Sequence, residues 1–218
     1  MTLKALFAID GPSGSGKSTT AKLLANRLGL GYLDTGAMYR AATAEVLRAE
    51  ADGALSEAEV VALVGAADLA CDTTPDAPRF RINGHDVTEE IREPRISAAV
   101  SRVATILEVR RILIDRMRGI IDAHGRAIVV EGRDITTVVA PDAEVRVLLV
   151  ADPAARVARR AAEVAGKASA EEVTDQVLRR DRDDSTVSNF TDAAEGVTVI
   201  DSTFLTPDQV VDRIISLA

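Results

Sequence analysis

Short apolar runs and amphipathic stretches alternate along this chain. Apolar runs predict strands at residues 3–9, 31–33, 127–131, 145–150 and 197–201. Three of these runs are nearly continuous, as expected of parallel strands that are covered on both faces. Apolar residues at helical spacing predict helices at residues 17–28, 37–49, 56–66, 96–104, 109–123, 153–165, 170–182 and 207–217. This order predicts an α/β fold: a doubly wound parallel sheet of about five strands with helices on both faces.

One segment departs from this alternation. Residues 79–87 alternate apolar and polar side chains around Asn83-Gly84, a pair that is the strongest short signal for a β-hairpin. Two prolines within residues 73–78 mark turns before it. We therefore predict an inserted subdomain with a β-hairpin at about residues 41–104, within a single domain whose core is about 1–40 and 105–218. A chain of 218 residues has room for one sizeable core and such an insertion.

A glycine-rich loop follows the first predicted strand and precedes the first predicted helix. Its sequence matches G-x-x-x-x-G-K-[ST] and consists of Gly11, Pro12, Ser13, Gly14, Ser15, Gly16, Lys17, Ser18 and Thr19. In such a loop the backbone N–H groups turn inward, and the helix N-terminus points at the same place. Lys17 then reaches the β- and γ-phosphates, and the Ser18 hydroxyl completes the shell of a Mg²⁺ ion. The loop predicts binding of a nucleoside triphosphate.

Composition limits the remaining possibilities. The net charge of −8 argues against general nucleic-acid binding, which usually needs a basic face. The single cysteine, Cys71, excludes internal disulfides and a cysteine-based zinc site. There is no signal-peptide pattern and no apolar run near 18 residues, so we expect a soluble, cytoplasmic protein without a membrane partner. We also expect a monomer.

The basic residues are unusual, because 22 are arginines and only four are lysines. Many of the arginines fall within residues 92–118 and 156–182. They could lie on solvated helix faces, or their planar guanidinium groups could converge on phosphates. Composition alone leaves both interpretations open.

Three segments narrow the kind of P-loop protein. The second predicted strand is followed by Asp34-Thr-Gly-Ala-Met-Tyr-Arg40, and the third ends in Glu131-Gly-Arg-Asp134. An arginine-rich stretch at residues 178–185 follows the fourth. Each of these segments places an aspartate and an arginine where a second substrate that carries a phosphate would lie beside the triphosphate. The chain has no N-K-x-D or D-x-x-G motif, which weighs against a GTPase switch.

Taken together, these motifs resemble the bacterial cytidylate kinases of the nucleoside monophosphate (NMP) kinase group. The resemblance covers nearly the whole chain. The motifs that carry it are I-D-G-P-S-G-S-G-K-S at 9–18, L-D-T-G-A-M-Y-R at 33–40, I-N-G-H-D-V-T-x-x-I-R at 82–92, V-S-R-V-A and V-R-R between 100 and 111, E-G-R-D-I-T-T-V-V at 131–139, P-D-A at 141–143 and R-R-D-x-x-D-S at 179–185. It implies transfer of the γ-phosphoryl group of ATP to CMP or dCMP with Mg²⁺; kinases for UMP, AMP or shikimate, and a regulator without turnover, stay open as alternatives.

The resemblance also implies roles for single residues. The residues implied on the CMP side are Thr35, Arg40, Ser101, Arg110, Arg133, Asp134, Arg180 and Asp184. Arg40, Arg133 and Arg180 of this set, together with Lys17 of the glycine-rich loop, would act on the phosphates, and Arg180 with Asp184 would contact the ribose. Asp134 can accept a hydrogen bond from the cytosine N4 amine, whereas it would repel the O4 carbonyl of uracil. Asp34, with Ser18, would lie at the metal and its water shell.

The chain departs from the family pattern in the lid over the nucleotides, which we expect at about residues 156–192. Family members usually carry another arginine seven residues after the one matched by Arg180, and Val187 stands there in this chain. The sequence therefore predicts a short lid in which another arginine, such as Arg179 or Arg182, supplies this cation. Thr136 also replaces a common glycine, a change we expect to be harmless.

Overall fold

The computed structural model describes residues 4–163, 174, 179 and 181–218. Its core is a sheet of five parallel strands in the order β2-β6-β1-β7-β8. The strands are β1 (Leu6–Asp10), β2 (Gly31–Asp34), β6 (Ile128–Gly132), β7 (Val145–Val150) and β8 (Thr198–Asp201). All five predicted strands form, which confirms the predicted fold class.

Seven α-helices have bounds within the described residues. They are α1 (Lys17–Leu28), α2 (Thr35–Ala49), α3 (Glu57–Ala66), α4 (Pro94–Ala104), α5 (Leu107–Ala123), α6 (Pro153–Glu163) and α8 (Pro207–Ile215). Thr206 caps α8, since its side chain accepts a hydrogen bond from the backbone N–H of Gln209. The predicted helix at 170–182 lies largely outside the described residues. None of the described helices combines the length and apolar character needed to cross a membrane.

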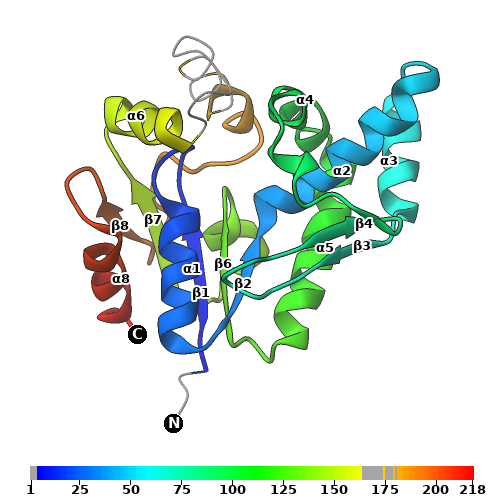
Figure 1. Cartoon of the computed structure of the whole chain (residues 1–218). Coiled ribbons are helices and arrows are strands. Elements are labelled where there is room, and N and C mark those ends of the chain that lie inside the picture. The colour runs from blue at the N-terminus through cyan, green and yellow to red at the C-terminus, as the bar shows by residue number, and fades with distance from the viewer. Residues whose placement is uncertain (1–3, 164–173, 175–178, 180) are drawn as a thin grey trace.

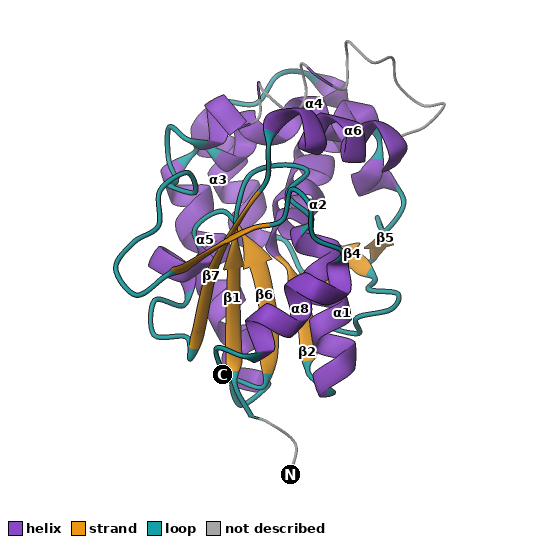
Figure 2. Cartoon of the chain, turned by 90° about the vertical axis from the view of Figure 1, so that its left-hand side faces the viewer, coloured by secondary structure: helices purple, strands orange, loops and turns teal. Residues whose placement is uncertain are grey.

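The central strand shows that both faces of the sheet are covered. Leu6 and Ala8 of β1 pack in a cluster with α2 and α5, while Phe7 and Ile9 pack in another with α1 and α8. This alternation follows from the two-residue period of a strand. Figure 2 shows α1 and α8 together on one side of the sheet. Burial on both faces is the physical reason for the apolar runs in the sequence.

The inserted segment forms a second, antiparallel sheet of three strands, β3 (Leu69–Cys71), β4 (Phe80–Ile82) and β5 (His85–Asp86). The predicted hairpin between β4 and β5 is present, and both Asn83 and Gly84 have positive φ angles, 49° and 80°, as a tight hairpin turn requires. β3 was not predicted, because its three residues, unlike those of β4, do not adjoin a hairpin signal such as Asn83-Gly84. Figure 1 shows this sheet with α2–α5 on one side of the central strands and α6, β8 and α8 on the other.

Candidate active site

The glycine-rich loop connects the buried end of β1 to α1, as predicted. Gly14 has a φ of 75°, and a Cβ there would lie 2.6 Å from the carbonyl oxygen of Arg156 on α6. The loop therefore needs glycine both for its backbone conformation and for the close approach of α6. The Lys17 ammonium donates to the carbonyl of Pro12 at 2.8 Å, so it lies folded over the loop.

Lys17 is nearly inaccessible to solvent, with 7% of its surface exposed. Burial and, to a smaller extent, the nearby Arg133 guanidinium lower its pKa to about 7, against the opposing charges of Glu131 and Asp181. A bound polyphosphate would return negative charge to this position and favour the charged ammonium. The site around Lys17 is thus built for an anion.

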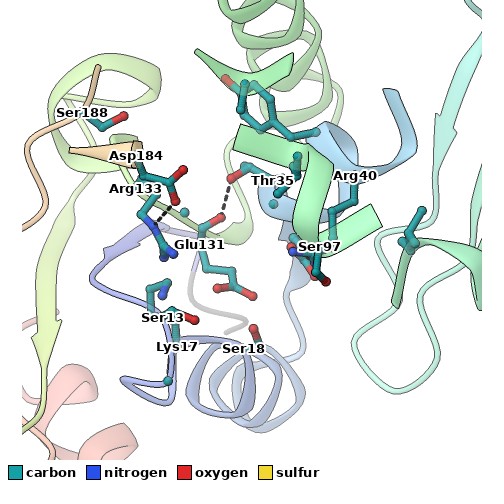
Figure 3. A pocket seen from close by; sticks show the side chains of 18 of the residues that line it. Ser13, Lys17, Ser18, Thr35, Arg40, Ser97, Glu131, Arg133, Asp184 and Ser188 are labelled. Carbon is teal, nitrogen blue, oxygen red and sulfur yellow. Dashed lines mark hydrogen bonds and ion pairs between the residues drawn. The ribbon is translucent and has the colours of Figure 1, made fainter. Parts of the chain in front are cut away.

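Two carboxylates lie at the carboxyl ends of the strands beside the loop. Asp34 ends β2 and Glu131 is the penultimate residue of β6, and both are buried. Burial raises the pKa of Glu131 and the charge of Asp34 adds to the rise, while Lys17 and Ser18 oppose it. Figure 3 shows the Glu131 carboxylate directed toward Ser18. No role was predicted for Glu131, although an acidic residue at the end of an apolar strand is a recognisable signal.

Asp34 is held by several donors. Its carboxylate accepts a hydrogen bond from the Ala37 backbone N–H at 2.7 Å, which caps α2. It also pairs with Arg40 at 3.3 Å and Arg92 at 3.0 Å. Burial alone would raise the pKa of Asp34, but the two arginines outweigh it and the pKa is lowered. Asp34 therefore positions Arg40 and Arg92 at the cleft. Arg92 was not among the site residues predicted from the sequence.

The segment after β6 carries Arg133 and Asp134. Arg133 donates to the carbonyl of Gly11 at 2.8 Å and to Asp184 at 3.1 Å. Asp134 forms a buried ion pair with Arg110 of α5. Burial raises the pKa of the Asp134 carboxyl, and Arg110 acts against the rise. The structure thus brings together four of the residues that the resemblance implied.

Asp10, at the end of β1, fixes this segment. Its carboxylate accepts hydrogen bonds from the backbone N–H groups of Ile135 and Thr136, both at 2.8 Å, and from the Thr136 hydroxyl at 2.7 Å. A short π-helical turn, Ile135–Val139, follows. Neither this turn nor the role of Asp10 was predicted. Thr136, at the position where the resemblance implies a glycine, therefore makes a buried hydrogen bond.

Residues after position 180 close the cleft from the side of α6. Asp181 accepts a hydrogen bond from the Ser13 backbone N–H at 2.9 Å and pairs with Arg156. The Ser188 hydroxyl accepts one from Arg110 at 3.0 Å. Val187 is half-buried, and its neighbour Ser188 is the residue that lines the cleft. Arg180 lies outside the described residues.

These elements surround a cleft of about 470 Å³. It extends from the glycine-rich loop to the Arg110–Asp134 pair, and Figure 3 shows its central part. The predicted residues that line it are Ser13, Gly14, Gly16, Lys17, Ser18, Thr19, Asp34, Thr35, Arg40, Arg110, Arg133, Asp134 and Asp184. Ser101 is buried on α4, but Ser97, Val100 and Ala104 of that helix are the residues that face the cleft.

Several buried polar atoms near the cleft have no hydrogen-bond partner among the described residues. They include the hydroxyls of Tyr39 and Ser101 and the Nε of Arg40. Because buried polar groups are nearly always hydrogen-bonded, such atoms are suited to a polar ligand. The Arg40 Nε is one such donor, on a side chain that lines the cleft.

The arginines divide between the cleft and the surface. Arg92, Arg110 and Arg160 line the cleft. In contrast, Arg102 and Arg111 form exposed ion pairs with glutamates on the surface. Folding therefore concentrates basic charge in the cleft of an acidic protein.

The parallel sheet, the loop at its carboxyl edge and the cleft beside it define a P-loop nucleotide-binding protein. The family model for cytidylate kinase matches residues 7–218. The chain belongs to the cytidylate kinase family.

Similar proteins support this assignment. A cytidylate kinase of Cutibacterium acnes is 56% identical over 97% of this chain and 95% of its own length. One of Caldanaerobacter subterraneus is 44% identical, with 98% of this chain and 94% of its own covered. Among solved structures, an uncharacterized protein from Eubacterium ventriosum covers 97% of this chain and 96% of its own, with a TM-score of 0.53 and 12% identity. That last similarity concerns the fold alone.

Proposed function

We propose that this protein transfers the γ-phosphoryl group of ATP to CMP or dCMP, which gives CDP or dCDP and ADP. The observation that carries the proposal is the continuous cleft between the glycine-rich loop and the buried Arg110–Asp134 pair. One end suits a triphosphate and the other a base with an exocyclic amine. Membership of the cytidylate kinase family supports the same pair of substrates.

The residues around the cleft suggest a division of labour. Lys17, Arg40 and Arg133, with Arg180, would neutralise the phosphates and hold them in line, which is most of what phosphoryl transfer needs. Thr35, Ser101, Arg110 and Asp134 would hold the acceptor nucleoside, with Asp184 at its ribose. Phosphoryl transfer then depends on how accurately these groups are positioned.

The oxygen donors beside the loop fit a magnesium ion, which prefers hydroxyl, carboxylate and water ligands. Ser18 would bind it directly, and Asp34 and Glu131 would hold its water molecules. When bound, Mg²⁺ neutralises charge on the transferred phosphate. Glu131 suits this role because the hydrogen bond with Ser18 and the charge of Lys17 both lower the pKa of its carboxyl group, against the effect of burial.

We further propose that the protein acts as a cytoplasmic monomer, with residues 41–104 forming the CMP-binding insertion and 156–192 the lid. A coupled assay of ADP release tests the activity with CMP, dCMP, UMP, AMP and no acceptor. Release that depends on CMP or dCMP supports the proposal. Preference for another acceptor would identify a different kinase, and binding without turnover would identify a regulator.

A further inference from the structure

Tyr32 of β2 holds the carboxylate of Glu131. β2 and β6 are parallel, with Tyr32 aligned with Val129 and Asp34 aligned with Glu131. Because side chains alternate between the two faces of a sheet, Tyr32 and Glu131 lie on the same face, two positions apart along the strands. The Tyr32 hydroxyl donates a hydrogen bond to Oε1 of Glu131 at 2.8 Å. The protein itself therefore holds one oxygen of this carboxylate.

This hydrogen bond is sheltered from solvent, since Tyr32 is fully buried and Glu131 is 4% exposed. Burial, and to a smaller extent the charges of Glu131 and Asp34, raise the pKa of Tyr32, so its hydroxyl stays protonated. A neutral donor orients a carboxylate without cancelling its charge. Asp34 differs in this respect, because it pairs with Arg40 and Arg92. Tyr32 therefore leaves the charge of Glu131 available to a cation.

Tyr32 is itself held from two sides. The Lys22 ammonium of α1 lies 5.7 Å from the centroid of its ring, within the range of a cation–π contact. β2 is an edge strand of the central sheet, and the Tyr32 backbone N–H donates to the carbonyl of Thr73 at 2.8 Å. The Thr73 hydroxyl lies 2.9 Å from Nε2 of His124. The inserted subdomain thus covers the edge of β2 at the residue that holds Glu131.

Glu131 has acceptor capacity left for the cleft. A carboxylate has about four lone-pair positions, and Tyr32 uses one of them. The others can accept from Ser18, toward which Glu131 is directed in Figure 3, and from water molecules. We propose that Tyr32 is a positioning residue for the metal site, which holds the Glu131 carboxylate in the orientation that faces Ser18 and the water shell of a magnesium ion. This inference rests on the proposed function, in which Mg²⁺ lies beside Ser18.

A metal-binding experiment tests this role without turnover. Mn²⁺ accepts the same carboxylate and water ligands as Mg²⁺, and electron paramagnetic resonance measures the free ion. In Tyr32→Phe, the Kd of Mn²⁺ for the complex of the protein with ADP should rise about tenfold, the lower end of the effect of outer-shell partners on metal affinity. Phenylalanine retains the ring, so the circular dichroism spectrum should be unchanged. An unchanged Kd for Mn²⁺ would overturn the proposal.

Thr43→Val is the matched control. The Thr43 hydroxyl also makes a buried hydrogen bond, to the carbonyl of Tyr39 at 2.8 Å within α2. Its removal should lower the stability of the protein, as measured in urea titrations, but leave the Kd for Mn²⁺ unchanged. If both variants weaken Mn²⁺ binding equally, the effect is a general loosening of the fold and the proposal is wrong.

A double-mutant cycle identifies the path of the effect. Glu131→Gln should itself weaken Mn²⁺ binding. If Tyr32 acts through Glu131, adding Tyr32→Phe to Glu131→Gln should change the Kd by less than about twofold, since effects of residues that act together are not additive. A further tenfold rise in the double variant would show that Tyr32 acts by another route, against the proposal.

Steady-state kinetics provide an independent readout. The Mg²⁺ concentration that gives half of the maximal rate should rise about tenfold in Tyr32→Phe, and kcat should recover at saturating Mg²⁺. A lower kcat that excess Mg²⁺ does not restore contradicts the proposal. CMP-dependent turnover of the unaltered protein tests the proposed function separately. If the unaltered protein turns over CMP and binds Mn²⁺ with ADP, but Tyr32→Phe does so equally well, only the role of Tyr32 is refuted.

Discussion

The most informative perturbation of the acceptor site is Asp134→Asn. Asp134 is 5% exposed, and its carboxylate is paired with Arg110. A carboxylate has about four lone-pair positions and accepts only, so beside Arg110 it retains the capacity to accept from cytosine N4. Asparagine can also donate, which makes the O4 carbonyl of uracil acceptable at the same place. The change should therefore reduce the preference for CMP over UMP.

The size of this effect follows from the charge and burial of the group. A buried hydrogen bond to a charged partner contributes about 1.5–3 kcal/mol, so the ratio of kcat/KM for CMP to that for UMP should fall about ten- to hundredfold. Weakening the buried pair with Arg110 can cost more, up to about 3–5 kcal/mol if the pair is lost. That loss affects both acceptors, so it cancels in the ratio.

The assay is ADP release with each acceptor, together with circular dichroism to verify the fold. Asp142→Asn is a matched control, because Asp142 is exposed and pairs only at the surface with Arg126 among the described residues. Its CMP/UMP ratio should equal that of the unaltered protein. If a folded Asp134→Asn protein also retains the ratio, Asp134 does not recognise the base.

Three further predictions concern other parts of the molecule. Lys17→Ala should lower kcat at least about 10²-fold, as expected when one electrostatic contact to the reacting group is removed, with an unchanged circular dichroism spectrum; substantial turnover would exclude Lys17 from the reaction. Thr136→Val should lower the free energy of unfolding by about 1 kcal/mol in urea titrations, because it removes one hydrogen bond to Asp10, and no loss would show that this bond contributes nothing. Burial raises the pKa of Cys71 to about 12, so at pH 8 a thiol reagent should modify the folded protein about a thousandfold more slowly than the urea-unfolded protein, since the thiolate is the reactive form; equal rates would mean that Cys71 is accessible.

Much of the fold could be predicted because its signals are local. The five parallel strands are buried on both faces and therefore contain apolar runs, and Asn83-Gly84 specifies a tight turn by its own conformational preference. The strand Leu69–Cys71 could not be predicted, since its three residues form too short a pattern and no tight-turn signal adjoins them. The π-helical turn Ile135–Val139 depends on hydrogen bonds to Asp10, which is 125 residues away.

The candidate site also has parts that could be predicted from the sequence and parts that could not. The glycine-rich loop is continuous in sequence, so its position and shape could be predicted from the motif. The partners of Asp34 could not, because Arg92 comes from the insertion, 58 residues further along the chain. Glu131 has a recognisable signal in the sequence, an acidic residue at the end of an apolar strand, but its role beside Ser18 is seen only when β6 lies next to β1. Contacts between distant segments, not residue types, decide these assignments.

The ion pairs of the cleft affect how substrates enter and leave. Asp181 occupies the Ser13 backbone N–H and pairs with Arg156, Asp184 pairs with Arg133, and Asp34 pairs with Arg40. A phosphate that uses these donors takes over positions that carboxylates hold, so its binding there is an exchange of anions, whereas the Arg40 Nε is a donor that no described residue occupies. The free energy gained in each exchange is smaller than that of the new contact alone, because the contact with the carboxylate is lost. When a nucleotide leaves, the carboxylates return to the same donors, so release does not leave the arginines exposed to one another's repulsion.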